Sequence, residues 1–211
     1  MTEEIIIAGF GGQGVLSMGK ILAYSGLMQG QEIAWMPSYG PEMRGGTSNV
    51  TVIISDERVS SPILTQYDTV IVLNQQSMDK FESTVKPGGT LIFDPNGITK
   101  MPTRKDINIY KIEAAQLASD MGNQKVFNMI VLGAFLKVRP IVDNKYVEEG
   151  LRHPLPERAH KLIPLNMEAI EKGNPKELSD MGLRYDLTLP LSRYYACNRN
   201  SLSTPFKVIQ I

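Results

Sequence analysis

Short apolar runs alternate with amphipathic segments along most of the chain. Residues 5–9 are a continuous β-branched run that ends in glycine, which is typical of a strand buried on both faces. Between Val15 and Gln29 the apolar positions recur near a period of 3.6, and Gly30 follows, so this segment predicts a helix. The same reading predicts strands at 33–36, 48–54, 59–61, 69–73, 90–94 and 107–112, and helices at 77–85, 114–121, 127–137, 144–151 and 164–172.

This alternation predicts the class of fold and the extent of the main domain. Strands that alternate with helices favour an α/β fold with a Rossmann-like, doubly wound, mostly parallel sheet and flanking helices. The length of 211 residues and the hydrophobic fraction of 42% suit one well-buried domain. The stretch 172–175, Lys-Gly-Asn-Pro, is typical of a helix end followed by a linker. We therefore expect a domain over 1–173 and a short extension over 174–211 that is not an independent domain.

Charge and cysteine content exclude some classes of function. The 22 basic and 22 acidic residues cancel, so the surplus of positive charge expected of a nucleic-acid-binding protein is missing. A net charge near zero also does little to keep molecules apart, which favours a chain that works in a complex. Cys197 is the only cysteine, so this chain cannot hold an iron–sulfur cluster, and no metal site is expected on it. With neither a basic leader nor a long apolar run, the protein is expected to be cytoplasmic and to bind no membrane.

The first candidate site is the glycine-rich segment Gly9-Phe10-Gly11-Gly12-Gln13-Gly14, which fits the pattern G-x-G-x-x-G between a strand and a helix. Such glycines permit a tight turn and let a phosphate approach the backbone, while the helix N-terminus offers free N–H groups. Alternatively, they only turn the chain. A nicotinamide cofactor is disfavoured, because no acidic residue follows the second strand to bind a ribose. We expect Gly11→Val to be costly and Gln13→Ala to cost much less.

The second candidate site is the loop at residues 38–47, from which we select Tyr39, Arg44, Gly45 and Gly46. An arginine among glycines can approach a phosphate or a carboxylate with two parallel hydrogen bonds. Alternatively, Arg44 is a solvated side chain paired with Glu42. Because both loops follow the carboxyl ends of strands, we expect them to be neighbours at the ligand crevice of the sheet.

Taken together, the segments Gly9 to Val15 and Tyr39 to Ser48 resemble the gamma subunit of 2-oxoacid:ferredoxin oxidoreductases, of the 2-oxoglutarate and ketoisovalerate type. The resemblance covers about residues 3–173. It implies a subunit of an enzyme that oxidatively decarboxylates a 2-oxoacid to an acyl-CoA and passes the electrons to ferredoxin. It also implies alpha, beta and delta partner subunits that hold thiamine diphosphate and the iron–sulfur clusters, and coenzyme A as a possible ligand of the glycine loop.

Other interpretations stay open beside this resemblance. The alternative is a stand-alone, Rossmann-like regulatory domain that binds a nucleotide or another anion. No catalytic residue is predicted, since His153 and His160 lack a metal-ligand spacing and no nucleophilic triad can be recognised. Residues 179–211 resemble a short segment of histidyl-tRNA synthetase that includes Asp186 and Thr188. This segment is too short for an aminoacylation site, so we assign it no function.

Overall fold

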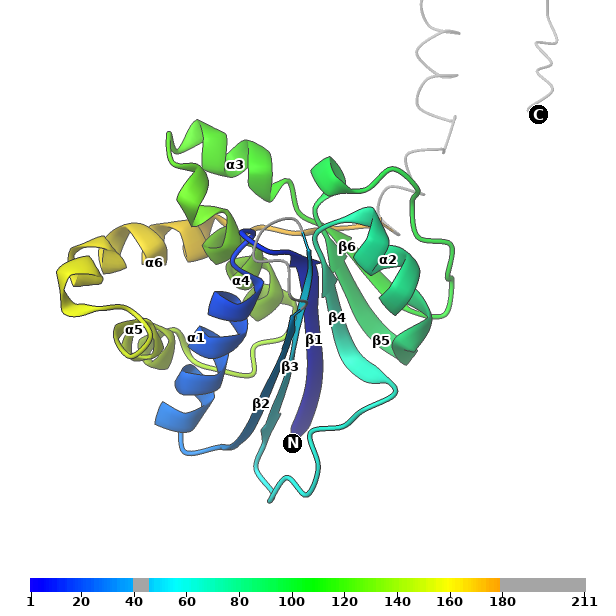
Figure 1. The fold of residues 1–211 in the computed structure, drawn as a ribbon, viewed down its shortest axis with the longest axis horizontal. Helices are drawn as coiled ribbons and strands as arrows, with labels where there is room; N and C mark the ends of the chain where they lie inside the picture. The colour runs from blue at the N-terminus through cyan, green and yellow to red at the C-terminus, as the bar shows by residue number, and fades with distance from the viewer. Residues whose placement is uncertain (40–45, 179–211) are drawn as a thin grey trace, which may run out of the picture. The chain divides into compact units, whose positions relative to one another are not determined.

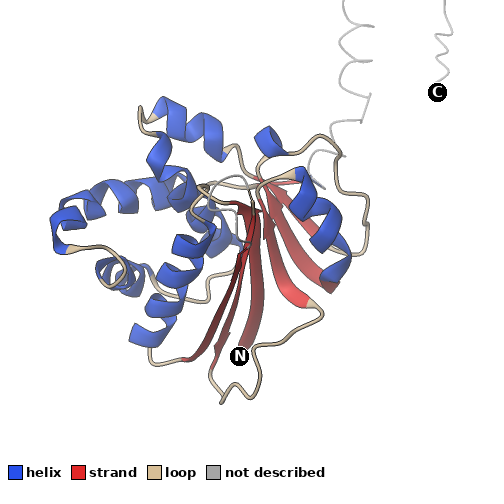
Figure 2. Cartoon of the chain, in the orientation of Figure 1, coloured by secondary structure: helices blue, strands red, loops and turns tan. Residues whose placement is uncertain are grey.

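The computed structural model describes residues 1–39 and 46–178. Within them, seven strands form one sheet in the order β2-β3-β1-β4-β5-β6-β7 (Figures 1 and 2). The strands are β1 (Thr2–Phe10), β2 (Glu32–Tyr39), β3 (Thr47–Ser55), β4 (Tyr67–Val72), β5 (Val85–Phe93), β6 (Asn108–Lys111) and β7 (Lys176–Glu177). The α-helices are α1 (Val15–Met28), α2 (Gln75–Phe81), α3 (Ala114–Asp120), α4 (Phe127–Val138), α5 (Asn144–Arg152) and α6 (Ile163–Lys172).

Strand β1 lies in the middle of the sheet and is buried on both faces. It pairs in parallel with β4, which is followed outward by the parallel strands β5 and β6. On its other side it pairs with β3 in antiparallel orientation, from Thr2 opposite Ser55 to Phe10 opposite Thr47. Ile5, Ile6 and Ile7 are all at most 1% exposed, as expected from their continuous apolar pattern.

Helices cover both faces of the sheet, which confirms the α/β, doubly wound prediction. One apolar core joins Ile5 and Ile7 of β1 to side chains of α1, α3, α4, α5 and α6. The second core joins Ile6 and Ala8 to Met78 and Phe81 near α2. Figure 1 shows this division, with α2 on one side of the sheet and α1, α4, α5 and α6 on the other. None of the helices in the described ranges is long and apolar enough to cross a membrane.

The structure differs from the sequence prediction at several element boundaries. Residues 59–61 form no strand, so the segment between β3 and β4 is a loop. Helix α2 ends at Phe81 and continues as a 3₁₀ turn, Glu82–Thr84, before β5 begins at Val85. Strand β5 thus includes Gly88, where the pairing with β4 shifts register. A Pro-Gly-Gly stretch looks like a turn in the sequence, but a bulge accommodates it inside a strand.

Strands β2 and β3 form an antiparallel hairpin, a connection that the doubly wound pattern did not predict. Strand β2 runs from Glu32 to Tyr39 and therefore includes Pro37, one residue beyond the end of the strand predicted at 33–36. Proline is tolerated here because β2 has a paired neighbour on one side only in the described sheet. Strand β3 therefore lies between β2 and β1 in the sheet.

A network of charged side chains lies at the end of the sheet where β1 begins. The Glu3 side chain is only 1% exposed and forms an ion pair with Arg139, the residue after α4. The Thr69 hydroxyl also donates to Glu3 Oε1, at 2.7 Å. Next to it, Lys86 Nζ lies 2.6 Å from Glu4 and 2.7 Å from Asp68. The pKa of Lys86 is raised: burial lowers it, and the hydrogen bonds and charges of the two carboxylates outweigh this.

The end of the described chain adds a last strand to the sheet. Residues Met1–Leu178 form one compact unit, and Lys176 and Glu177 pair with Lys111 and Tyr110 of β6. Leu178 packs against the second core. The division of the chain at residue 173 and the synthetase-like resemblance stay predictions, because residues 179–211 lie outside the described residues.

We predict that a chain ending at Leu178 unfolds cooperatively with a melting temperature close to that of the full chain. A chain ending at Gly173 lacks β7 and the Leu178 contact, and a loss of about 1 kcal/mol should lower its melting temperature by about 2–4 °C. Thermal unfolding followed by circular dichroism measures both. Loss of the cooperative transition in the chain ending at Leu178 would contradict the prediction.

Candidate functional site

The glycine loop connects the end of β1 to the start of α1. Gly12 and Gly14 have φ angles of 102° and 78°, in the left-handed region that glycine adopts without strain. Gly14 is the N-cap residue of α1 and makes no side-chain capping hydrogen bond. The first turn of α1 therefore presents free backbone N–H groups and contains no acidic side chain.

The side chain of Gln13 holds this loop in place. Its Oε1 accepts a hydrogen bond from Phe10 N at 2.7 Å, and its Nε2 donates to the Leu73 carbonyl, just after β4, at 3.2 Å. A Cβ at Gly9 would lie 2.5 Å from the same Oε1, so a glycine is required beneath the amide. We expected replacement of Gln13 by alanine to cost little. The structure gives this residue a larger role, because its amide joins the glycine loop to the segment that follows β4.

The glycine loop lies beside the described end of the second candidate loop, as predicted, at the end of the sheet where β1 finishes. Gly11 N donates to the Gly46 carbonyl at 3.0 Å. The adjacent residues Phe10 and Thr47 form the last pair between β1 and β3. Arg44 and Gly45 lie outside the described residues. Tyr39 is the last residue of β2, and its side chain is also outside the description. Of the four residues selected from the second loop, Gly46 is therefore the one that the structure places beside the first loop.

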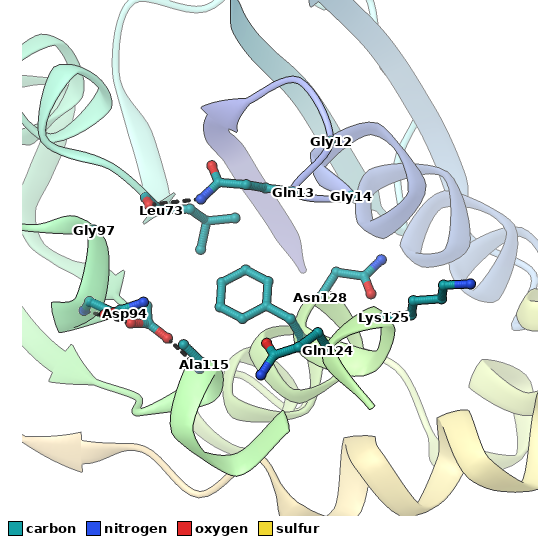
Figure 3. A pocket seen from close by; sticks show the side chains of 12 residues that line it. Gly12, Gln13, Gly14, Leu73, Asp94, Gly97, Ala115, Gln124, Lys125 and Asn128 are labelled. Atoms are coloured by element: carbon teal, nitrogen blue, oxygen red, sulfur yellow. Dashed lines mark hydrogen bonds between the residues drawn. The ribbon is translucent and has the colours of Figure 1, made fainter. Parts of the chain in front are cut away.

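The glycine loop forms one wall of a cleft of about 450 Å³ (Figure 3). Gly12, Gln13 and Gly14 contribute this wall, and residues that follow β4 and β5 form the floor. The opposite wall comes from a 3₁₀ turn, Gln124–Val126, and the start of α4. The other lining residues are Leu73, Asp94, Asn96, Gly97, Ala115, Gln124, Lys125, Phe127 and Asn128.

The first turns of α1 and α4 come close together across this cleft. A Cβ at Gly14 would fall 2.5 Å from Asn128 Nδ2, so a larger residue would push the two helices apart. Helix α4 has no acidic residue in its first turn, and it continues from the 3₁₀ turn, where Asn123 accepts from Lys125 N and Phe127 N donates to the Gln124 carbonyl. Lys125 lies beside its start, exposed, and forms no ion pair within the described ranges. The N-terminal ends of α1 and α4, on facing walls, and the Lys125 side chain together make the cleft suited to an anion.

Asp94 is an acidic residue that lines the cleft, and backbone groups occupy its carboxylate. The side chain is 1% exposed and accepts hydrogen bonds from Asn96 N at 2.7 Å and Ala115 N at 2.8 Å. Burial raises the pKa of this carboxyl, while the backbone N–H groups act in the opposite direction. We conclude that Asp94 shapes the cleft by capping α3.

Sequence reasoning did not identify Lys125 and Asn128 as part of the site. Both lie more than a hundred residues after the glycine loop, and a polar residue at the start of a helix is common in any protein. Only the packing of α4 against α1 shows that they face Gly14.

We predict that Gln13→Ala lowers the free energy of unfolding by about 1–2 kcal/mol, because it leaves the Phe10 N–H and the Leu73 carbonyl without their partner. Gln13→Glu serves as the comparison, since a carboxylate can still accept from Phe10 N but cannot donate to Leu73 O. Urea unfolding of the unmodified chain, Gln13→Glu and Gln13→Ala ranks the three proteins by their free energy of unfolding. Equal stability of Gln13→Ala and the unmodified chain would show that the amide does not hold the loop.

Comparison with known protein families relates this fold to one family. The model of the pyruvate ferredoxin/flavodoxin oxidoreductase family matches residues 4–174. The 2-oxoglutarate synthase subunit KorC of Methanocaldococcus jannaschii is 34% identical over 177 residues, covering 82% of this chain and 92% of that protein. The ketoisovalerate oxidoreductase subunit VorA of Methanothermobacter marburgensis is 34% identical over 171 residues, or 81% of this chain. The chain spans about a third of the length of VorA, 35%.

Solved structures agree with this assignment. The gamma subunit of a keto/oxoacid ferredoxin oxidoreductase from Geobacter sulfurreducens superposes with a TM-score of 0.71 at 30% identity, over 83% of this chain and 99% of that one. A 2-oxoglutarate:ferredoxin oxidoreductase from Magnetococcus marinus, solved with 2-oxoglutarate, coenzyme A and succinyl-CoA bound, gives 0.73 at 25% identity, over 82% and 30%. The chain belongs to the pyruvate ferredoxin/flavodoxin oxidoreductase family, and its relatives include gamma subunits of 2-oxoacid:ferredoxin oxidoreductases.

Proposed function

We propose that this chain is the gamma-type subunit of a multi-subunit 2-oxoacid:ferredoxin oxidoreductase and is inactive alone. Such an enzyme oxidatively decarboxylates a 2-oxoacid, forms an acyl-CoA and passes electrons to ferredoxin. The match to KorC over 92% of that subunit supports a separate gamma chain. The match to about a third of VorA, 35%, is consistent with the same module inside a longer chain.

The proposal assigns the redox and thiamine chemistry to alpha, beta and delta partner subunits in the cytoplasm. Within the described residues, no group of three or more histidine, cysteine, aspartate or glutamate side chains is placed to hold a metal ion. The sole cysteine of the sequence, Cys197, lies outside those residues. In this proposal the partners hold thiamine diphosphate and the iron–sulfur clusters, since a single cysteine cannot supply the thiolate ligands of a cluster.

For the cleft at the glycine loop, we propose that it binds the phosphate part of coenzyme A. The observation that carries this proposal is the meeting of the first turns of α1 and α4 beside Lys125, with no acidic residue in either turn. Backbone N–H groups at such helix ends bind phosphate oxygens. Coenzyme A is a phosphate-bearing ligand, and it is present in the related enzyme of Magnetococcus marinus.

The second candidate function is a stand-alone anion-binding or regulatory domain. The feature that favours it is the glycine loop at the uncapped start of α1, an arrangement that binds anions in stand-alone domains as well. The two functions differ in whether the chain has companions, and isolation of the chain from its native host distinguishes them.

We predict that the tagged chain, isolated from its native host, brings down large companion subunits and the brown absorbance of iron–sulfur clusters. The same chain purified alone should oxidise no 2-oxoacid in the presence of coenzyme A and a viologen dye, since the proposal places the cluster and thiamine sites on the partner subunits. Recovery of a colourless chain without companions would support the regulatory alternative.

We further predict that Lys125→Gln raises the apparent KM for coenzyme A of the assembled enzyme about fivefold and leaves kcat unchanged. The reason is the loss of one exposed charge from the phosphate site, worth about 1 kcal/mol. Lys105→Gln is the matched control, because Lys105 is an exposed lysine in the loop before β6, at the opposite end of the parallel strands. An unchanged KM in Lys125→Gln would contradict a phosphate site at this position, even if the companions are recovered.

A further inference from the structure

A second hollow lies between α1 and β2, separate from the glycine-loop cleft. It is a groove of about 480 Å³, lined by one side of α1 and by the first half of β2. Figure 1 shows these two elements at one edge of the sheet, because β2 has a paired neighbour on one side only in the described part of the chain. Neither the glycine loop nor the start of α4 contributes to this groove.

Two large apolar side chains of the groove are exposed to solvent. Leu27 of α1 is 53% exposed and Trp35 of β2 is 39% exposed. Trp35 is the only tryptophan of the sequence. The other exposed large apolar residues in the described ranges, Met1, Ile63, Met101 and Leu162, come from separate segments. An exposed tryptophan beside an apolar groove is typical of a protein–protein contact.

Opposite charges lie at the two ends of this groove. A Cβ at Gly19, next to Lys20, would contact Val50 and Val52, which pair with Pro37 and Trp35 of β2. Lys20 is therefore level with the Trp35 end of the groove.

The next close contact along α1 shows which residues lie at the other end of the groove. A Cβ at Gly26 would lie 2.7 Å from Ile33 Cδ1, so Leu27 is level with the start of β2, where Glu32 lies. Both Lys20 and Glu32 line the groove and are exposed. Neither forms an ion pair with any residue that the structure describes.

We propose that this groove is the contact between two copies of the chain. A two-fold axis through the middle of the groove places Lys20 of each copy opposite Glu32 of the other and puts each Trp35 against the partner's apolar lining. A surface with opposite charges at its ends is self-complementary under such an axis. The formal net charge of zero adds no long-range repulsion between the copies. The contact lies outside the proposed coenzyme A cleft and does not depend on that assignment.

Sedimentation equilibrium of the full chain tests the contact first. The 23.4 kDa monomer should give way to a dimer as the concentration rises into the range of tens to hundreds of micromolar, since a contact built on the eight residues that line the groove is small among protein interfaces. The emission of Trp35 should shift to shorter wavelength over the same concentrations. A chain that stays monomeric up to the highest of these concentrations would overturn the proposal.

Leu27→Asp then locates the contact, because it leaves the Trp35 reporter in place. This variant should stay monomeric, and its emission should no longer depend on concentration. Leu162→Asp is the matched control: it makes the same change at an exposed leucine, 43% accessible, at a separate site, and should dimerise normally. Dimerisation of Leu27→Asp, or loss of the dimer in Leu162→Asp alone, would place the contact elsewhere.

Charge exchange gives the sharpest test of the two-fold arrangement. Lys20→Glu and Glu32→Lys each place like charges opposite each other in a symmetric pair, so each variant alone should dimerise at least tenfold more weakly. Mixed together, the two variants restore both opposite-charge contacts, and a heterodimer should form. Circular dichroism confirms that both variants are folded. Weakened variants that do not associate on mixing would overturn the two-fold arrangement.

Discussion

The close approach of Gly14 to Asn128 is the constraint on which the site depends. With a Cβ at residue 14, the starts of α1 and α4 could not be this near, and the two helix ends would no longer face one anion. Close contacts at two further glycines hold α4 on the side that faces α6. A Cβ at Gly133 would lie 1.9 Å from the Ile170 carbonyl, and one at Gly173 would lie 2.2 Å from the Ile130 carbonyl. Glycines thus set the position of α4 on both sides, against α1 and against α6.

Much of the fold could be predicted from local patterns. The apolar run at 5–9 identified the central strand, and the 3.6 period after Val15 identified α1, because burial on both faces and on one helix face leave distinct patterns. The neighbourhood of the two loops was also predicted correctly, although by a different connection. Strand β2 turns back into β3, and this hairpin brings Gly46 to Gly11.

What could not be predicted depends on contacts between distant segments. Nothing local to Lys125 or Asn128 indicates that they face the glycine loop. The bulge in β5 was likewise hidden, since Lys86-Pro87-Gly88-Gly89 has the composition of a turn and only the pairing with β4 and β6 makes it part of a strand. Gln13 was underestimated for the same reason, because its partner Leu73 is sixty residues away.

The ion pair between Glu3 and Arg139 has a mechanical consequence for the cleft. It attaches the residue that follows α4 to the first strand of the sheet, at the end of the helix remote from the glycine loop. Because a helix of 12 residues is about 18 Å long, this ion pair and the Gly14–Asn128 contact hold α4 at two well-separated ends. The wall of the cleft that α4 contributes is therefore held at three points along the helix, because Gly133 in its middle also lies against the Ile170 carbonyl.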